Sequence, residues 1–491
     1  MDWQEEYKRK LRSPEEAAKL IKSGDVVMAM GGSTDQPKIM QQAIFDRRDE
    51  LKDVYVLHGC PLRDPGWLSP GAEDSFKVDL TGYIGPIGRA SVNERRTGFI
   101  PVSWAFTLKA YERPGEHRPI DWDLMVVSPP NKHGFCSLGH ALWFKKDMMR
   151  RSKRIIAEVD ENVKWLYGDT TIHVSEVDYF VEYTPPLIPD EELPKALAGV
   201  EPEEKRKKIE EYTKQLLPNM RPTVMGVLML MDIPGIDSIA ETLGLLPCVE
   251  AEPVAGYVNM LLKSRDCFQI GQGSPSAFLP RFGAFAGKED LGHHTEMTAR
   301  GIGNMIKEGQ ITGKYKNFYP GKAVFSALDG LSPEELGYAT ENPRFELYRT
   351  SWVTSIAVVA TNDNMVSLQN GISIDLTGQI NSESIFGGIM LNGPGGQPDI
   401  HIGALYSKGG RAITVMRATA VNGTISCIVP QFEPGTVATI PREYADYIVT
   451  EFGIAKLMGK SLRERAEELI AIAHPDYRAE LRKEAQKLFW P

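Results

Sequence analysis

The chain has 491 residues, of which 42% are hydrophobic and 25% charged, and its formal net charge is −9. This composition is typical of a folded globular protein of about two domains. The negative charge argues against a nucleic-acid partner, which needs a basic face. No apolar run approaches the roughly 20 residues that span a bilayer, so no membrane partner is expected.

The five cysteines are widely spaced, odd in number and without C-x-x-C pairs. This pattern predicts reduced thiols rather than a disulfide framework or a zinc site. The charged N-terminal stretch has a helical pattern and lacks the apolar core of a signal peptide. We therefore expect a cytoplasmic protein.

The first elements follow an α/β pattern. Ser13 can cap a helix, Pro14 suits its first turn, and Glu16 stands at the capping-box position. This helix is expected to end at Gly24. The residues beyond it predict a strand, a glycine turn, a helix and a second strand, at 26–30, 31–33, 37–51 and 53–59. A strand-helix-strand order implies parallel pairing through right-handed crossovers.

A similar order returns about 240 residues later. It predicts a helix, a short strand, a glycine turn and a second helix, at 252–264, 267–270, 271–274 and 275–285. We interpret this as a weak internal repeat that gives two related α/β halves. The alternative is that any two strand-helix units look alike.

Two further stretches are helix-prone. Residues 195–222 are charged and bounded by prolines, which is typical of a solvated helix or linker. Residues 461–489 predict two amphipathic helices split at His474-Pro475. The expected organisation is an N-terminal α/β domain at 1–194, a charged helical insertion or linker at 195–245, and a C-terminal α/β domain at 246–491.

The stretch LGHHTEM at 291–297 places one carboxylate, Glu296, beside two histidines. If the stretch is a short strand, His294 and Glu296 share one face and His293 takes the other. Adjacent histidines on opposite faces chelate poorly, and no second cluster has ligand spacing, so no metal is expected. A structural role for Glu296, bonded to a backbone turn or a lysine, is the alternative to a reactive one.

Two glycine-rich turns flank this stretch, 271-GQGSPS-276 and 392-NGPGGQPD-399. Glycines let the backbone approach a ligand and expose N–H groups as oxyanion donors. Neither turn is a P-loop or a dinucleotide fingerprint, and each could be only a tight turn. A carboxylate between such loops is the arrangement expected for covalent acyl chemistry.

Longer motifs extend this interpretation over nearly the whole chain. They read LGHHTEM (291–297), IDLTGQINSE (374–383), NGPGGQPDIHIGALYSKGGRAI (392–413), ISCIVP (425–430), DYIVTEFGIAKLMGKSLRERAEELIAIAHPDYR (446–478), VSPPNKHGFCSLG (127–139) and GDTTIHVSEVDYFVE (168–182). In these motifs, taken together and in order, the chain resembles the acetyl-CoA hydrolase/CoA-transferase family.

The resemblance implies the CoA-transferase fold, which consists of two related open α/β domains with mainly parallel sheets. It implies ping-pong transfer of CoA from an acyl-CoA to a small carboxylic acid, through a mixed anhydride and a glutamyl-CoA thioester on Glu296. Coenzyme A is then a substrate, no cofactor is tightly bound, and a homodimer or higher oligomer is expected. The alternatives are an acyl-CoA hydrolase, in which water intercepts the same intermediate, and a non-catalytic binding protein.

Several site residues follow from the same motifs. Glu296 stands at the position of the catalytic glutamate. The resemblance gives Gly396 two roles, as a CoA contact and as a catalytic oxyanion donor, and it makes Asn392 a further CoA contact. Gln397 and Asp399 are assigned to loop structure. The first CoA and oxyanion loop comprises Gly271, Gln272, Gly273, Ser274 and Pro275.

The chain also departs from the family pattern. Pro275 has no N–H where the family uses a backbone donor, so Ser274 or Ser276 is a candidate replacement. Val421 stands where the family often has a lysine that contacts CoA phosphate. The segments 195–245 and 162–169 differ as well, which suggests a divergent subfamily. The candidate replacements for the lysine are Lys408, Arg411 and Arg417.

Overall fold

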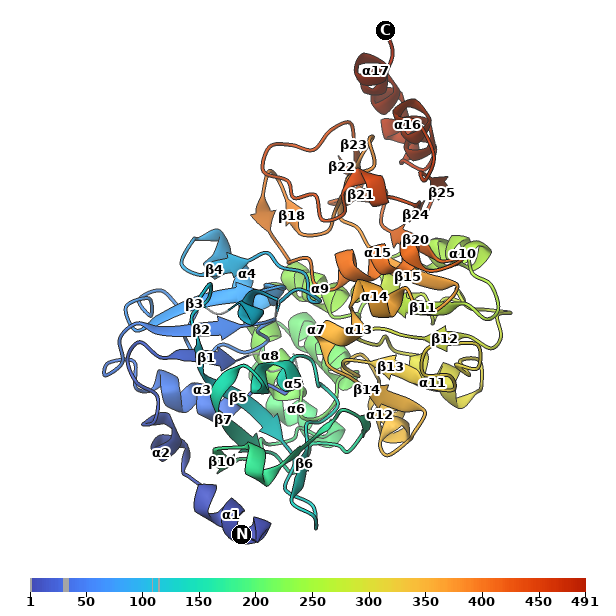
Figure 1. Cartoon of the computed structure of the whole chain (residues 1–491). Coiled ribbons are helices and arrows are strands. Elements are labelled where there is room, and N and C mark those ends of the chain that lie inside the picture. Colours follow the sequence, from blue (N-terminus) through green and yellow to red (C-terminus); the bar gives the residue numbers. More distant parts are fainter. Residues whose placement is uncertain (1, 30–34, 108, 114) are drawn as a thin grey trace. The chain divides into compact units, whose positions relative to one another are not determined.

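The computed structural model describes residues 2–29, 35–107, 109–113 and 115–491. The chain divides into two compact units (Figure 1). The first unit comprises residues 1–239 and 325–353, and the second comprises residues 240–324 and 354–491. Residues 195–239, expected to lie outside both domains, therefore belong to the first unit. Residues 325–353, expected in the C-terminal domain, belong to it as well.

The first unit is built on a seven-stranded sheet in the order β10-β7-β5-β1-β2-β3-β4. Every pairing in this sheet is parallel. The strands are β1 (Val26–Ala29), β2 (Val54–His58), β3 (Phe76–Thr81), β4 (Gly98–Ile100), β5 (Ile120–Val127), β7 (Ser152–Val159) and β10 (Tyr179–Glu182). β1 is buried at every position, which explains its continuous apolar sequence.

The helices of the first unit are shorter than the sequence predicts. The capping box between Ser13 and Glu16 forms, but the regular helix it begins ends at Ala18. The expected glycine turn at 31–33 lies outside the described residues. Glu158, at the end of β7, accepts hydrogen bonds from the backbone N–H groups of Lys38, Ile39 and Met40. The N-terminus of α3 is therefore occupied by an internal carboxylate. The helices are α1 (Trp3–Lys10), α2 (Pro14–Ala18), α3 (Lys38–Phe45), α4 (Gly85–Asn93) and α5 (Lys145–Met149).

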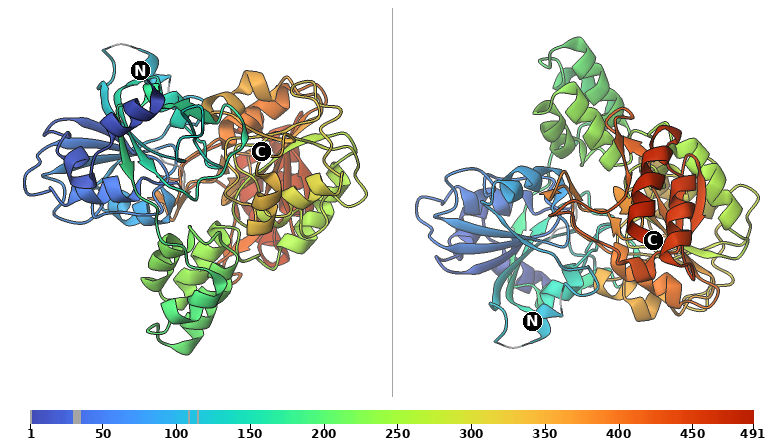
Figure 2. Two further views of the ribbon diagram at one scale, coloured as in Figure 1. Left: turned by 90° about the horizontal axis from the view of Figure 1, so that it is seen from below. Right: turned by 90° about the horizontal axis from the view of Figure 1, so that it is seen from above.

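The charged stretch after residue 190 forms short helices rather than a linker. They are α6 (Leu193–Ala196), α7 (Glu203–Lys214), α8 (Arg221–Met229) and α9 (Ile233–Thr242). In Figure 2 the green helices α7 and α8 pack side by side. Arg221 is buried and donates to the carbonyls of Ile188 and Leu216, which anchors the start of α8. The unit is completed by β6 (Phe135–Ser137), β8 (Tyr167–Gly168), β9 (Thr171–His173), α12 (Pro333–Ala339), β14 (Phe345–Leu347) and α13 (Thr350–Val353).

The second unit has a six-stranded sheet in the order β12-β11-β15-β20-β24-β25 (Figure 1). All pairings are parallel except that of the edge strand β25. The strands are β11 (Cys267–Ile270), β12 (Gly292–His293), β15 (Met365–Asn370), β20 (Arg411–Val415), β24 (Tyr447–Thr450) and β25 (Gly453–Lys456). The order β12-β11-β15-β20-β24 matches β2-β1-β5-β7-β10 of the first unit, strand for strand in chain order. The expectation of two related, mainly parallel α/β halves is confirmed.

One expected helix of the second unit does not form. After the glycine turn, residues 276–278 make only a 3-10 turn, and the chain continues in turns to 287. Pro280 cannot continue a helical hydrogen-bond ladder, and Gly283 takes a positive φ of 82°. The helices that do form are α10 (Ala251–Leu261), α11 (Ile302–Lys307), α14 (Ile356–Val359), α15 (Gln397–Tyr406), α16 (Leu462–Ala471) and α17 (Arg478–Phe489).

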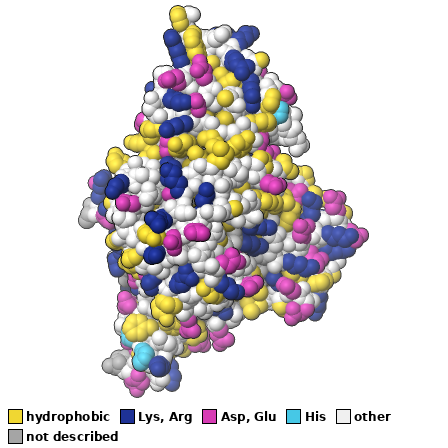
Figure 3. Space-filling view, turned by 90° about the vertical axis from the view of Figure 1, so that its right-hand side faces the viewer, with side chains coloured by type: hydrophobic (Ala, Val, Ile, Leu, Met, Phe, Trp, Pro, Cys, Tyr) yellow, Lys and Arg dark blue, Asp and Glu magenta, His cyan; other side chains and the backbone are white. Residues whose placement is uncertain are grey.

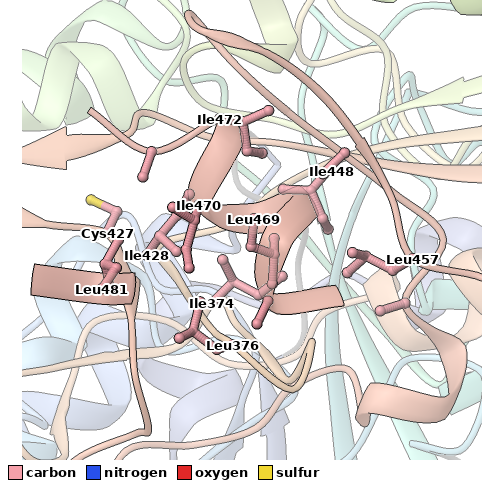
Figure 4. Packing of buried hydrophobic residues seen from close by; sticks show 14 of the residues in the cluster. Ile374, Leu376, Cys427, Ile428, Ile448, Leu457, Leu469, Ile470, Ile472 and Leu481 are labelled. Carbon is pink, nitrogen blue, oxygen red and sulfur yellow. The ribbon is translucent and has the colours of Figure 1, made fainter. Parts of the chain in front are cut away.

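The predicted C-terminal helices α16 and α17 are confirmed, with their break at His474-Pro475. Leu469 and Leu481 pack in one buried cluster with Ile448 of β24 (Figure 4). Short strands lie before and after the second glycine loop in the chain, and they form small sheets of two or three strands. They are β16 (Ser373–Asp375), β17 (Ile380–Asn381), β18 (Ser384–Ile385), β19 (Ile389–Met390), β21 (Thr419–Ala420), β22 (Ile425–Ser426) and β23 (Ile428–Val429), and β13 (Ala323–Phe325) spans the boundary between the units.

The surface view agrees with the mixed charge of the sequence. On the face shown in Figure 3, lysine and arginine side chains are interspersed with acidic ones. Within the described ranges, no helix is long and apolar enough to cross a membrane.

Candidate active site

Glu296 lies just beyond the end of β12, at the edge of the second sheet. The strand is shorter than the sequence suggests: it ends at His293, and Glu296 sits in a bend. His294 donates its backbone N–H to Phe268 O at 3.1 Å, and Thr295 donates to Val324 O at 3.0 Å. These bonds fix the chain that leads to Glu296. The carboxyl ends of parallel strands are where open α/β sheets bind ligands.

Gly396 lies directly against the Glu296 carboxylate. A Cβ atom built on Gly396 would lie 1.9 Å from Glu296 Oε2 and 3.0 Å from Thr354 Cγ2. Gly396 is the N-cap of α15 and has a φ of −92°, which any residue can adopt. The glycine is therefore required by close approach and not by backbone conformation. It brings the positive end of a ten-residue helix to the carboxylate.

The environment of Glu296 raises the pKa of its carboxyl group from 4.5 to about 8. Burial is the main cause, the negative charge of Asp399 adds to it, and the Gly396 N–H opposes it. The Oε2 atom is buried and has no hydrogen-bond partner among the described residues. Such a carboxylate is more basic than an exposed one, and it gains more than an exposed one from any donor that reaches it.

The two histidines are buried neighbours of the site. The His293 ring packs against Phe268 with centroids 4.4 Å apart. Burial and the ammonium of Lys316 lower the pKa of His293 to about 3. The Lys316 ammonium donates to the backbone carbonyl of His293 at 3.0 Å, and this hydrogen bond holds the end of β12. In the described part of the chain, no group of three or more His, Cys, Asp or Glu side chains is arranged to hold a metal ion.

The first glycine loop follows β11 and is bonded to its neighbours. Gly271 N donates to Leu368 O, and Ser276 Oγ donates to Gly271 O, both at 2.7 Å. The Gln272 side chain donates to Thr298 O at 2.7 Å, which ties the loop to the chain just after Glu296. The loop is thus held beside the carboxylate. Gly273 lies within it at a positive φ of 83°.

The two serines proposed to replace the missing donor of Pro275 are both engaged. Ser274 N donates to Glu241 O at 3.2 Å, and Ser274 Oγ accepts from Cys248 N at 2.9 Å. Ser276 N donates to Asn370 Oδ1 at 3.1 Å. Each backbone N–H would therefore have to leave a protein partner before it could serve an oxyanion.

Asn370, at the end of β15, joins the two glycine loops, and the sequence motifs did not reveal it. Its side chain donates to the carbonyls of Gln272 and Gly273 and accepts from Ser276 N. Its own carbonyl accepts from the Gln397 amide at 3.1 Å, at the start of α15. The only signal in the sequence was its place directly after a buried strand and before Gly371.

The second loop connects β19 to α15. Asn392 N donates to Glu383 O at 3.1 Å, and the Asn392 amide lies 3.5 Å from Ser382 O. This fixes one end of the loop, and Gln397 fixes the other through Asn370. Asp399, expected to have only a structural role, is almost fully buried in the first turn of α15, where its charge acts on Glu296.

The candidate replacements for the missing lysine lie elsewhere in the second unit. Val421 is an exposed turn residue with a φ of 51°. Arg411 pairs with Asp266, and Arg417 pairs with Glu241 and lies 3.5 Å from Glu250. Both arginines are therefore neutralised by carboxylates. The Lys408 backbone carbonyl accepts from Asn364 N at 2.8 Å.

Family models match both ends of the chain. Residues 1–189 match the acetyl-CoA hydrolase/transferase N-terminal domain, and residues 334–485 match the C-terminal domain. The chain is 32% identical to the 4-hydroxybutyrate coenzyme A transferase of Clostridium kluyveri over 100% of both chains. It is 30% identical to the succinyl-CoA:cyclohexane-1-carboxylate CoA transferase of Geobacter metallireducens, over 99% of this chain and 97% of that one.

Solved structures of related proteins also match this chain over almost its whole length. RipA from Yersinia pestis superposes with a TM-score of 0.79 at 28% identity, over 100% of both chains. The 4-hydroxybutyrate CoA-transferase of Porphyromonas gingivalis superposes with a TM-score of 0.70 at 27% identity, over 99% of this chain and 100% of that one. Together with the full-length relatives, these matches identify a CoA-transferase enzyme, and the chain belongs to the acetyl-CoA hydrolase/transferase family.

Proposed function

We propose that the protein transfers CoA between an acyl-CoA and a free carboxylic acid, with Glu296 as the covalent nucleophile. The observation that carries this proposal is the contact between Glu296 and Gly396, because it joins a buried, basic carboxylate to a backbone donor at a helix N-terminus. A nucleophile beside preorganised donors is the arrangement that acyl transfer requires.

The proposed reaction runs through two covalent intermediates. The Glu296 carboxylate attacks the acyl-CoA carbonyl and expels CoA thiolate, which leaves a mixed anhydride. The thiolate then attacks the glutamyl carbonyl carbon and expels the acyl group as a free carboxylate, which leaves a glutamyl-CoA thioester. A second carboxylic acid reverses these steps and departs as the new acyl-CoA. Each tetrahedral oxyanion needs N–H donors, and the Gly396 N–H supplies one of them in the proposal.

Shielding of one oxygen of the Glu296 carboxylate supports transfer over hydrolysis. Anhydrides and thioesters both react with water, so the site must exclude water during the lifetime of the intermediates. Glu296 Oε2 is shielded from solvent, and Thr354 next to Gly396 is fully buried. Ionised Glu296 is also basic, which favours attack on a carbonyl carbon.

In the proposal, CoA lies along the two glycine loops that meet at Asn370. Residues 271–275 and Asn392 hold the pantetheine end, with Gly396 next to the thioester. Because α15 begins at this point, with Gly396 as its N-cap, its dipole favours the negative charge that develops there. Support comes from the shared anchoring of both loops on one residue, since the first loop bonds the Asn370 side chain and Gln397 bonds the Asn370 backbone carbonyl.

The test is direct detection of the glutamyl-CoA adduct. Acyl-CoA is added without acceptor, and the digest is examined by mass spectrometry for a CoA-sized addition on the peptide that holds Glu296. Borohydride should reduce this thioester and inactivate the enzyme. Glu296→Gln should abolish adduct and turnover. The matched control is Glu451→Gln, since Glu451 is a half-buried glutamate of the same unit that caps Ala418 N.

An acyl-CoA hydrolase is the second candidate, because the chain is also 23% identical to the acetyl-CoA hydrolase of Candida albicans over 97% of its length. The two functions differ in what resolves the thioester. CoA release should depend on an added acid, and an acceptor screen should include 4-hydroxybutyrate, succinate and cyclohexane-1-carboxylate, which the names of the relatives suggest. Rapid CoA release without any acid would overturn the transferase proposal. The expected homodimer is tested by light scattering.

A further inference from the structure

Gln269, near the end of β11, has an amide that is bonded on one side only. Its Oε1 accepts from Ser367 Oγ at 3.2 Å and from the Gln369 amide at 3.0 Å. Its Nε2 is buried and has no partner among the described residues. The residue is only 1% exposed, so this N–H cannot turn to solvent. A buried donor without an acceptor lowers stability, and it calls for an explanation.

Strand order defines where this donor faces. β11 lies between β15 and β12, and both residues that bond Oε1 belong to β15. Oε1 and Nε2 are bonded to the same side-chain amide carbon of Gln269 and point in different directions. With Oε1 bonded to β15, Nε2 points away from β15. The register pairs Cys267 with Gly292 and Phe268 with His293, so Gln269 stands beside His294, which directly follows β12, and Glu296 comes two residues later.

Gln269 and Glu296 also lie under the same helix. Side chains alternate along a strand, so Gln269 shares the face of Cys267. Cys267 packs with Ile400 and Ala404 of α15, and the N-cap of α15 is Gly396, which touches the Glu296 carboxylate. Diagonal neighbours on adjacent strands lie about 7–8 Å apart, a distance that long side chains bridge.

We propose that Gln269 is a positioning residue for the nucleophile: its free Nε2–H donates a hydrogen bond to the Glu296 carboxylate when that carboxylate ionises, and so holds it in the attacking orientation. This inference rests on the proposed role of Glu296. Ser367 and Gln369 set the amide orientation, and the N–H is kept uncommitted until charge develops. A hydrogen bond to a charged group is worth about twice a neutral one.

The charged groups near Glu296 whose interactions are described act differently. Asp399, from α15, carries a negative charge and acts in the opposite sense. His294 precedes Glu296 on its own strand segment. His293, on the other face, is neutral at working pH because its pKa is about 3. The ammonium of Lys316 is bonded to the backbone carbonyls of His293 and Lys322.

The test is the pH dependence of kcat/KM in Gln269→Met, which keeps the volume and removes the donor. We expect the ionisation that controls activity to shift upward, and kcat/KM at pH 7 to fall roughly 10- to 100-fold, the effect of one hydrogen bond to a charged group. Activity should recover as pH rises. The matched control is Gln41→Met in the first unit, because the Gln41 amide is likewise buried and unpartnered; it should leave the profile unchanged.

Ser367→Ala is a second, milder variant, in case Gln269→Met does not fold. It removes one of the two donors that orient Gln269 Oε1. The ionisation that controls activity should move in the same direction as in Gln269→Met, and kcat/KM at pH 7 should fall a few-fold. A wild-type pH profile in folded Gln269→Met would overturn the inference, as would an equal loss in Gln41→Met. If Glu296→Gln kept its activity, the proposed function itself would fail, so the two failures are distinguishable.

Discussion

Gly396 and Glu296 touch so closely that no side chain fits between them: a Cβ on residue 396 would lie 1.9 Å from Glu296 Oε2. Gly396→Ala must therefore push the carboxylate aside. Because that carboxylate is the far end of a flexible side chain, we expect a small stability loss. Activity should fall by roughly 100-fold or more, the effect of a displacement of about 1 Å at a reacting group. Steady-state kinetics and thermal unfolding check this.

The matched control for that variant is Gly256→Ala in α10. No atom lies within 4 Å of a Cβ at that position, and the residue is helical. Alanine should leave kcat/KM unchanged and stabilise the helix by about 0.5–1 kcal/mol. An equal loss of kcat/KM in Gly396→Ala and Gly256→Ala would show that the effect of Gly396→Ala is not specific to the site.

The raised pKa of Glu296 predicts a pH-dependent stability. Its folded pKa of about 8 exceeds the ordinary value of 4.5, so the folded protein binds the proton more tightly than the unfolded chain. This stabilisation is present below pH 4.5 and is lost as pH rises toward 8, by about 1.4 kcal/mol per pH unit at most. Glu296→Gln removes the ionisation, so its free energy of unfolding should exceed that of the wild type at pH 8 by more than at pH 5. Denaturant titrations at both pH values measure the difference.

Activity should follow the same ionisation in the opposite direction. In the proposed mechanism the nucleophile is the charged form of Glu296, so kcat/KM should rise with pH and level off above about 8. A flat profile between pH 6 and 9 would be inconsistent with Glu296 as the ionising nucleophile in the free enzyme.

Asp399→Asn tests the charge that acts on Glu296 from α15. The Asp399 carboxylate raises the pKa of Glu296, although burial contributes more. The amide keeps the shape and removes the charge, so the kinetic ionisation should move to lower pH by about one unit, as expected for a nearby like charge. The pH dependence of adduct formation provides the measurement. An upward shift would mean that Asp399 serves Glu296 chiefly as a hydrogen-bond partner.

Asn370→Ala should separate the two glycine loops. The side chain bonds Gln272 O, Gly273 O and Ser276 N, so its loss leaves three backbone groups without that partner. We expect the free energy of unfolding to fall by about 1–3 kcal/mol. We also expect the KM for acyl-CoA to rise, because CoA lies along both loops in the proposal. Asn259→Ala is the comparison, because the side chain of Asn259, on α10, also bonds three backbone groups, the carbonyls of Gly283, Ala284 and Ala286. It should lose stability without the change in KM.

Local signals in the sequence predicted local structure well. The Ser13 capping box, the buried strand at Val26 and the break at His474-Pro475 each depend on residues a few positions apart. The helix expected after Pro275 failed for an equally local reason, since Pro280 and Gly283 interrupt it. The end of β12 before Glu296 was not visible, because pairing with β11 and Val324 decides it.

The candidate site was predictable only in part. Glu296 and Gly396 follow from motifs, but Asn370 and Gln269 act through partners about 100 residues away along the chain. Such contacts depend on which strands are neighbours and on their register. Spacing within one segment does not contain that information.

Residues 325–353 belong to the first unit although they follow part of the second unit in the chain, and this has a consequence for synthesis on the ribosome. β14 pairs with β8, so the first unit is complete only after residue 353 has emerged, when the whole β11–β12 region has already been synthesised. Residues 240–324, which carry Glu296, therefore leave the ribosome between two pieces of the other unit. A truncated chain that begins near residue 240 would carry β14 without β8, so Glu296 is best studied in the full-length protein.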